Sequence, residues 1–147
     1  MISVFLICAI FIFYIYGGYH IIIHLLSSFK KPLSSVHIED WPSISVIVVM
    51  KNEEKHAVNR IKNLLNQYPN DKLEINVFLD SPKDKTKAEL SIIDSNSLKI
   101  YHETLAIGKS ACVSKGIQLA KHDYLIFTDA RQEFESGAIK SLVRHLL

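Results

Sequence analysis

The first 29 residues of this 147-residue sequence contain no Asp, Glu, Lys or Arg. All 17 basic and 15 acidic residues lie at or after Lys30, so an uncharged segment is followed by a charged one. Cysteine is also scarce: Cys8 and Cys112 lie in different segments, which excludes a disulfide-stapled scaffold. With 5 Gly and 4 Pro, a collagen-like or disordered protein is excluded as well. The formal net charge of +2 is too small to indicate nucleic-acid binding.

The uncharged segment is long enough to cross a membrane. Ile2 to Leu26 reads ISVFLICAIFIFYIYGGYHIIIHLL, which exceeds the roughly 20 apolar residues that a helix needs to span the hydrocarbon core. A cleavable signal peptide is disfavoured, because the basic amino-terminal region, short apolar core and small-residue cleavage site are all missing. We therefore predict a transmembrane helix over residues 1–29. Lys30 and Lys31 follow it, so the positive-inside rule predicts a single span in the cell (inner) membrane with the charged part in the cytoplasm.

The charged segment begins with a linker and continues with alternating strand and helix patterns. Residues 30–42 (KKPLSSVHIEDWP) hold two prolines and no sustained periodicity, which predicts a juxtamembrane linker. Short apolar runs predict strands over 43–50, 73–79, 98–102 and 124–128. Helical spacing of apolar residues predicts helices over 54–67, 86–93, 110–120 and 136–147. This alternation predicts an α/β domain over 43–147, with a mostly parallel sheet flanked by helices.

Two missing features narrow this fold class. No Gly-x-Gly-x-x-Gly or Walker lysine loop follows any predicted strand, so the dinucleotide-binding fold and the P-loop enzymes are disfavoured. The last helical pattern reaches Leu146 and Leu147 without a glycine, asparagine or proline to end it. We therefore expect a truncated domain, cut within a larger fold.

Polar side chains follow the predicted strands, at the edge of a parallel sheet where ligands bind. They come after the first, second and fourth strands and at the start of the third helix: Asn52, Glu53, Glu54, Asp80, Asp84, Gly108, Lys109, Asp129 and Arg131. Carboxylates at such an edge can accept hydrogen bonds from a nucleobase or ribose and can hold a divalent cation. A glycine and a lysine at a helix start favour an anion. The rim therefore suits a nucleoside diphosphate compound.

Some of these residues have a purely structural alternative. Glu53 and Glu54 can serve only to stabilise the dipole of the helix that follows them, and Asp80 can be only a turn residue. Asp129 is the hardest to explain in this way, because a carboxylate that ends an apolar strand needs partners.

Four segments, in order, resemble the amino-terminal half of a family 2 glycosyltransferase with the GT-A (Rossmann-like) fold. They read PSISVIVVMKNEE, VFLDSPKDKT, AIGKSACVSKGIQLA and YLIFTDARQEFESGAIKSLV, and together they extend over 42–147. The resemblance implies the donor-binding half of a hexosyltransferase of the inverting type. Such an enzyme takes a nucleoside diphosphate sugar and transfers the sugar to a glycan or lipid-linked acceptor. The resemblance also implies that the catalytic base lies beyond Leu147.

The first two segments imply contacts to the nucleoside of the donor. Asn52 and Glu53 match the family's Asn-Glu pair, whose glutamate contacts the base or ribose. Asp80 matches an aspartate that hydrogen-bonds the nucleobase, and Asp84 and Thr86 stand at later positions of the same motif. The resemblance therefore assigns Asn52, Glu53 and Asp80 to donor binding.

The last two segments imply contacts to the diphosphate. Lys109 matches a lysine near the pyrophosphate, and Asp129 matches the first aspartate of the Asp-x-Asp motif, which contacts ribose and a bridging Mg²⁺ or Mn²⁺. Arg131 occupies the second acidic position of that motif. A guanidinium removes a metal ligand and supplies a cation that can pair with phosphate. We therefore expect Lys109, Asp129 and Arg131 to bind the donor, with Asp129 as the metal ligand and the need for a metal in question.

The sequence thus predicts a membrane-anchored glycosyltransferase, or a truncated piece of one, that works on polysaccharide or lipid-linked acceptors. The alternative is a non-catalytic membrane-tethered module that binds a nucleotide sugar or acts as a scaffold, which Arg131 and the missing acceptor half would favour. A phospho-receiver domain fits poorly, because Asn52-Glu53 stands where such a domain needs an acidic pair.

Overall fold

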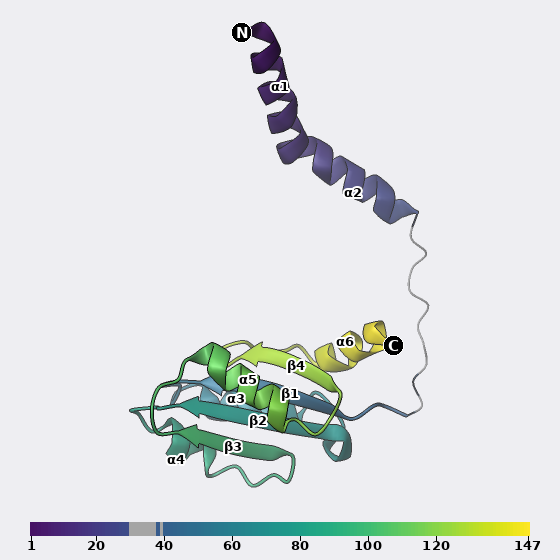
Figure 1. The fold of residues 1–147 in the computed structure, drawn as a ribbon. Helices are drawn as coiled ribbons and strands as arrows, with labels where there is room; N and C mark the ends of the chain where they lie inside the picture. The colour runs from purple at the N-terminus through teal and green to yellow at the C-terminus, as the bar shows by residue number, and fades with distance from the viewer. Residues whose placement is uncertain (30–37, 39) are drawn as a thin grey trace. The chain divides into compact units, whose positions relative to one another are not determined.

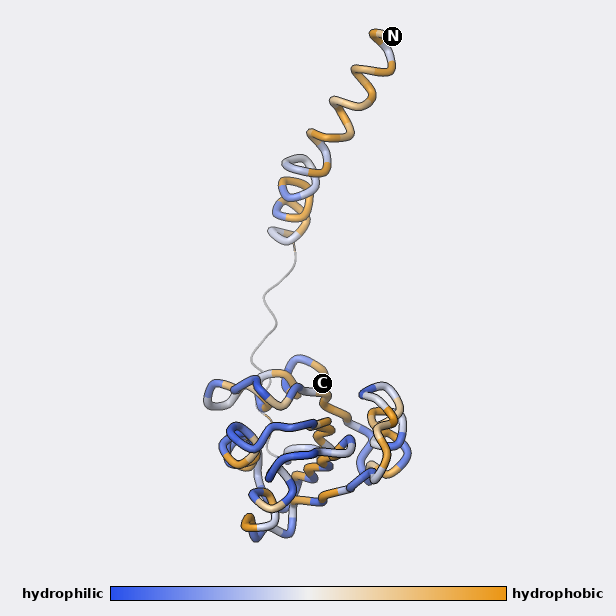
Figure 2. Tube along the Cα trace, turned by 90° about the vertical axis from the view of Figure 1, so that its left-hand side faces the viewer, coloured by the Kyte–Doolittle hydropathy of each residue, from blue (hydrophilic) through white to orange (hydrophobic). Residues whose placement is uncertain are grey.

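A computed structural model describes residues 1–29, 38 and 40–147, and these residues divide into two compact units, Met1–Val36 and His37–Leu147. The first unit is a single 27-residue helix, Ile2–Ser28, built from α1 (Ile2–Phe13), a π-helical segment (Tyr14–Gly18) and α2 (Tyr19–Ser28). Its surface is hydrophobic along most of its length (Figure 2). By length and composition this helix can cross a membrane, and a signal sequence would pass the same test.

The second unit is an α/β domain, as the alternation of apolar patterns predicts (Figure 1). Its elements are β1 (Ile44–Met50), α3 (Ala57–Leu65), the 3₁₀ turn η2 (Asn70–Lys72), β2 (Leu73–Asp80), α4 (Thr86–Leu90), β3 (Leu98–Glu103), α5 (Lys109–Leu119), β4 (Tyr124–Asp129) and α6 (Ala138–Leu146). The strands form one sheet in the order β3-β2-β1-β4, and every neighbouring pair is parallel. All four carboxyl ends of the strands therefore lie at one edge.

Three helices are shorter than their patterns predict, and the one expected over 136–147 covers Ala138–Leu146. The helix expected over 54–67 begins only at Ala57, because the Glu53 carbonyl accepts the N–H groups of both His56 and Ala57 and so forms the turn that opens the helix. The helix expected over 86–93 ends at Leu90, after which the N–H groups of Ile92 and Ile93 bond three residues back and tighten the chain. The late start of α3 leaves the residues that follow β1 in a turn rather than in a helix.

One face of the sheet carries the main hydrophobic core. It is packed against α3, α4 and α6, whose buried apolar residues join those of the strands. The members from the strands alternate along each chain: Ile44, Val46, Val48 and Met50 in β1, and Leu73, Ile75, Val77 and Leu79 in β2. This period of two is typical of one side of a strand. Burial at this face accounts for most of the apolar contact in the domain.

The opposite face is covered by α5 alone and is chemically different (Figure 1). Ile47, Phe78 and Cys112 form its small buried cluster. Gly116 of α5 lies directly over it, and a Cβ at that position would come within 2.7 Å of Ile47 Cγ2. Glycine is therefore required for α5 to approach the sheet this closely. In β2 the residues before and beyond this cluster on the same face are polar, and Asp80 ends that strand at the carboxyl edge. In β4 only the last residue of this face, Asp129, is polar.

The predicted linker over 30–42 lies largely outside the described residues. Its last residues belong to the α/β domain. Trp41 packs edge-on against Tyr68 with ring centroids 5.7 Å apart, and the carbonyl of Pro42 accepts a hydrogen bond from the Tyr68 hydroxyl at 2.8 Å. The chain is therefore fixed to the domain from Trp41 onward.

Candidate functional site

The candidate site lies at the carboxyl edge, where β1 and β4 are neighbours. Val49 near the end of β1 pairs in register with Asp129 at the end of β4. The turn after β1 begins at Asn52, whose φ of 54° lies in the left-handed region that asparagine tolerates better than most residues. The start of α5 completes this region, because Lys109 reaches Asp129 at the end of β4.

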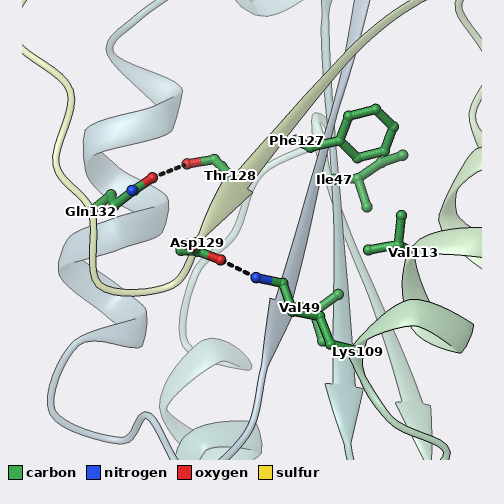
Figure 3. Close-up of a pocket in the computed structure, with 8 residues that line it drawn as sticks. All are labelled: Ile47, Val49, Lys109, Val113, Phe127, Thr128, Asp129 and Gln132. Carbon is green, nitrogen blue, oxygen red and sulfur yellow. Dashed lines mark hydrogen bonds and ion pairs between the residues drawn. The ribbon is translucent and has the colours of Figure 1, made fainter. Parts of the chain in front are cut away.

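Lys109 and Asp129, predicted together as donor ligands, form an ion pair. Gly108 precedes α5 with a φ of 86°, a conformation that favours glycine, and the helix begins at Lys109. The Lys109 ammonium donates a hydrogen bond to the Asp129 carboxylate (Figure 3). Both side chains stay open to solvent, with 66% and 53% of their surfaces exposed. An exposed pair of this kind is held weakly, so either partner is available to a ligand.

A hollow of about 250 Å³ lies beside this ion pair. Its lining joins apolar side chains from the α5 face of the sheet to the polar rim: Ile47, Val49, Lys109, Val113, Phe127, Thr128, Asp129 and Gln132 (Figure 3). A second hollow shares part of this lining and adds Glu53, Ala130 and Arg131. We call the two together the rim hollow. An apolar wall beside paired charges suits a ligand with a flat or hydrophobic part and an anionic part.

Glu53 and Arg131 form the second ion pair of the rim. Arg131 Nε donates to both carboxylate oxygens of Glu53, at 2.9 and 3.0 Å. The hydrogen bond that Arg131 donates to Glu53 raises the pKa of the guanidinium above its ordinary value. The two side chains differ sharply in burial, because 10% of Glu53 is exposed and 70% of Arg131. Glu53 thus holds one end of Arg131 while the other end faces solvent.

The structure places Asp80 beneath a loop rather than open on the rim. One carboxylate oxygen accepts the N–H groups of Ile107 at 2.7 Å and Gly108 at 3.3 Å, and the other lies 3.5 Å from the Lys51 ammonium. Burial alone would raise the pKa of this carboxyl, but these hydrogen bonds and the lysine outweigh it and lower the pKa. Only 4% of Asp80 is exposed. Asp80 therefore fixes the loop that presents Gly108 and Lys109.

The predicted motif residues Asp84 and Thr86 join the turns after β1 and β2. The Asp84 carboxylate accepts the N–H groups of Glu54 and Thr86, both at 3.0 Å, and the Thr86 hydroxyl accepts the N–H of Glu53 at 2.8 Å. Burial would raise the pKa of Asp84, yet the hydrogen bonds from Thr86 and Glu54 lower it overall. Asn52 adds to this framework, because its carbonyl oxygen accepts the N–H of Lys83 at 2.8 Å. These residues set the position of Glu53.

Arg60 is a residue near the site that the sequence prediction missed. It lies in α3, is 2% exposed, and donates to Thr128 next to Asp129 and, at 2.9 Å, to Asn63. Its hydrogen-bond partners among the described residues include no carboxylate, and burial lowers the pKa of its guanidinium. The signal was present, since Arg60 lies on the apolar stripe of its helix next to Ile61 and Leu64. Gln132, which lines the rim hollow, gave no comparable signal.

The carboxylates of the rim do not converge on one point. Across the described ranges 1–29, 38 and 40–147, no three His, Cys, Asp or Glu side chains lie close enough together to hold a metal ion. Asp129 is paired with Lys109, and Glu53 with Arg131. A divalent cation prefers several oxygen ligands, so Asp129 alone is a poor fit to the metal-ligand role predicted for it.

Comparisons with known proteins agree with this geometry. A family model described as glycosyl transferase family 2 matches residues 45–147. Beta-monoglucosyldiacylglycerol synthase of Nostoc sp. (strain PCC 7120 / SAG 25.82 / UTEX 2576) is 28% identical over 107 residues, which cover 69% of this chain and 23% of that protein.

Two solved structures are similar in fold. The mannosyltransferase PcManGT from Pyrobaculum calidifontis, in complex with GDP-Man and Mn²⁺, superposes with a TM-score of 0.74 at 23% identity, over 94% of this chain and 42% of that chain. S. aureus TarS 1-349 superposes with a TM-score of 0.62 at 23% identity, over 68% of this chain and 31% of that chain. These similarities confirm the predicted GT-A fold. The chain spans less than half the length of each of these relatives.

Proposed function

Because the chain belongs to glycosyltransferase family 2, we propose that it binds a nucleoside diphosphate sugar in the rim hollow and takes part in transfer of the sugar. The single observation that supports this most is the meeting of two ion pairs, Lys109 with Asp129 and Arg131 with Glu53, around one hollow at the carboxyl edge. Ligands bind at this edge in open parallel sheets. Lysine and arginine are the side chains that pair with phosphate oxygens.

The rim residues take different parts in donor binding. Lys109, at the start of α5, binds the diphosphate, and its partner Asp129 is then free to accept hydrogen bonds from ribose hydroxyls. Asn52 and Glu53, in the turn after β1, line a neighbouring hollow that shares Arg131 with the rim hollow, and we assign this hollow to the nucleoside. Asp80 acts from below through the loop that it fixes at Ile107 and Gly108. These assignments retain the site residues predicted from the sequence but change the parts of Asp80 and Glu53, which act through the loop and the arginine that they hold.

The structure of the Pyrobaculum enzyme is named as a complex with Mn²⁺. In this chain Asp129 is half-exposed and already paired with Lys109. We propose that Mg²⁺ or Mn²⁺, where either takes part, is held mainly by the donor's phosphates. The Lewis acidity of such an ion would stabilise the leaving diphosphate. The residues of this chain bind and orient the donor without it.

The acceptor is a glycan or a lipid-linked molecule, and a lipid is favoured on two grounds. The Nostoc relative is named for the synthesis of a glycosyldiacylglycerol. The helix Ile2–Ser28 is apolar along its length and can anchor the chain beside lipid substrates. With Lys30 and Lys31 after the helix, the proposed location is the inner membrane with the domain on the cytoplasmic side. Inversion at the anomeric carbon is part of the same proposal.

Donor binding is tested by calorimetry on the full chain in detergent, with UDP-sugars and GDP-sugars in turn. Each donor is titrated once with a chelator and once with Mn²⁺. We expect one nucleotide class to bind and Asp129→Ala to weaken it at least tenfold. If no donor binds in either buffer, the proposed function is wrong. Binding without transfer to membrane lipid extracts would instead favour the non-catalytic module.

A further inference from the structure

Arg131 has hydrogen-bonding capacity that its partner does not use. Only Nε contacts Glu53. The two terminal nitrogens make no hydrogen bond to any residue in the described part of the chain, although together they carry four N–H donors. Because Glu53 is nearly buried and is itself fixed through Thr86, the guanidinium is held at one end, while the rest of the side chain is open to solvent and lines the rim hollow and two neighbouring hollows.

Two cations, Lys109 and Arg131, line the rim hollow. Buried Arg60 lies below the end of β4, where the charges of Glu133 and Asp129 oppose its own. Each carboxylate that lines the rim hollow already has a cationic partner, Asp129 with Lys109 and Glu53 with Arg131. A metal ion therefore meets carboxylates that are already paired, whereas an anion can take either cation from its exposed side.

Arginine at this position also changes what the turn after β4 can hold. It lies two residues after Asp129, so its guanidinium occupies the place from which a second carboxylate would join Asp129 in binding a cation. A guanidinium cannot ligate a metal, since it has no free lone pair at neutral pH. It can bind two phosphate oxygens at once through its parallel N–H groups.

We propose that Arg131, positioned by Glu53, is a direct ligand of the donor diphosphate and supplies there the positive charge of a divalent ion, so that a nucleoside diphosphate binds without metal. Lys109 contributes the second cation. Glu53 acts through Arg131 and is a positioning residue. The proposal rests on the proposed function, since it concerns the same donor site. It assigns to Arg131 and Glu53 a metal-replacing part that goes beyond their placement in the donor site.

The test uses the full chain in detergent, with UDP and GDP as probes, each titrated in EDTA and in Mn²⁺. We expect the dissociation constant of the preferred nucleotide to differ by less than about threefold between the two buffers. Arg131→Ala should weaken binding at least tenfold in EDTA. Arg131→Asp, which restores a second carboxylate beside Asp129, should abolish binding in EDTA and regain part of it in Mn²⁺. Arg144→Ala removes an exposed arginine from α6 and should leave the dissociation constant unchanged in both EDTA and Mn²⁺.

The positioning role of Glu53 has its own readout. Glu53→Gln keeps the shape of the side chain and removes the charge that holds Arg131. We expect it to weaken nucleotide binding several-fold, and the double variant with Arg131→Ala to be no weaker than Arg131→Ala alone. A purely structural role would instead make the two losses add. Thermal unfolding of each variant at the wild-type temperature shows that the fold is retained.

The possible failures are distinguishable. If wild-type protein binds a nucleotide only in Mn²⁺, the donor site stands and the metal-replacing role of Arg131 is wrong. If Arg131→Ala binds as tightly as wild type in EDTA, Arg131 is not a diphosphate ligand. If neither nucleotide binds in either buffer, the donor site itself is wrong and this proposal falls with it.

Discussion

Two charged clusters lie on the α5 face of the sheet, at opposite ends of its strands. The Glu74 cluster, made of Ser45, Glu74, Asn76 and Lys99, lies near the amino ends of β1, β2 and β3. The two rim pairs, Lys109 with Asp129 and Arg131 with Glu53, lie at the carboxyl ends. Strand register places Glu74 and Asp129 on one face, because Glu74 pairs with Ser45 and Asp129 with Val49, four residues further along β1.

The two clusters differ in how many of their hydrogen-bonding groups already have partners within the protein. Glu74 is 5% exposed, and its carboxylate accepts from the Ser45 hydroxyl at 2.7 Å, the Lys99 ammonium at 2.7 Å and the N–H of Lys121 at 3.0 Å. At the rim, Arg131 and Lys109 are mostly exposed and retain free donors. A closed cluster stabilises the fold, whereas an open one can exchange its partners for a ligand. Charge on a sheet face therefore indicates a binding site only where it stays exposed.

The largest expected effect is on stability and comes from breaking the Glu74 cluster, which is the closed one. Glu74→Ala leaves the buried Ser45 hydroxyl and the partly exposed Lys99 ammonium without their acceptor, which costs about 3–4 kcal/mol of unfolding free energy. Glu103→Ala is the matched control, because Glu103 pairs with Lys115 at 2.6 Å on the same face near solvent. Glu103→Ala should lower the free energy of unfolding by less than about 1 kcal/mol. Urea unfolding of both variants measures the difference, and equal losses would contradict the comparison.

The second-largest effect is expected from acid, which should weaken the Glu74 cluster. Burial by itself raises the pKa of Glu74, but the hydrogen bonds from Lys99, Ser45 and Lys121 outweigh it and lower the pKa to about 2, from an ordinary 4.5. The stability from this shift is complete above about pH 4.5 and is lost as the pH falls towards 2. This contribution of Glu74 to the free energy of unfolding is about 3 kcal/mol.

The measurement is unfolding free energy against pH for wild type and Glu74→Gln. Asp80 and Asp84 also have lowered pKa values, so they contribute to acid loss in both proteins. The difference between the two curves isolates Glu74. We expect the curves to approach one another below pH 4.5. Curves that stay parallel down to pH 2 would show that Glu74 does not hold a lowered pKa.

The position of the rim could be predicted from sequence, because it depends on local patterns. Each apolar run that ends in a polar residue marks a strand end, and parallel strands bring those ends to one edge. Asp129 is predicted in this way, and Lys109 is predicted from the glycine and lysine at a helix start. The Glu74 cluster is not predicted, although Glu74 and Asn76 alternate with apolar residues in β2. The run over 73–79 predicts only a strand, and its two polar residues receive no role in that prediction.

The partners of these residues could not be predicted, because they come from distant parts of the chain. Asp80 was expected to face the nucleobase, yet a loop 27 residues further on folds over it and takes its hydrogen bonds. Arg131 was expected to meet phosphate, and its contact with Glu53 spans 78 residues. Such contacts depend on strand order and loop path, which a local pattern does not contain.

The smallest effect on stability, and a large one on binding, is expected from Lys109→Met at the open cluster. The Lys109–Asp129 pair is exposed on both sides, so its loss should cost less than about 0.5 kcal/mol. Nucleotide binding should weaken at least tenfold, because one of the two cations at the rim hollow is gone.

Lys115→Met is the matched control: it removes the same charge from the same helix, and its partner Glu103 lies at the end of β3 rather than of β4. Calorimetry with UDP and GDP, beside urea unfolding, separates the two variants. Equal binding by both would mean that charge on α5, rather than its place beside Asp129, attracts the nucleotide, and the contrast between closed and open clusters would then not mark the site.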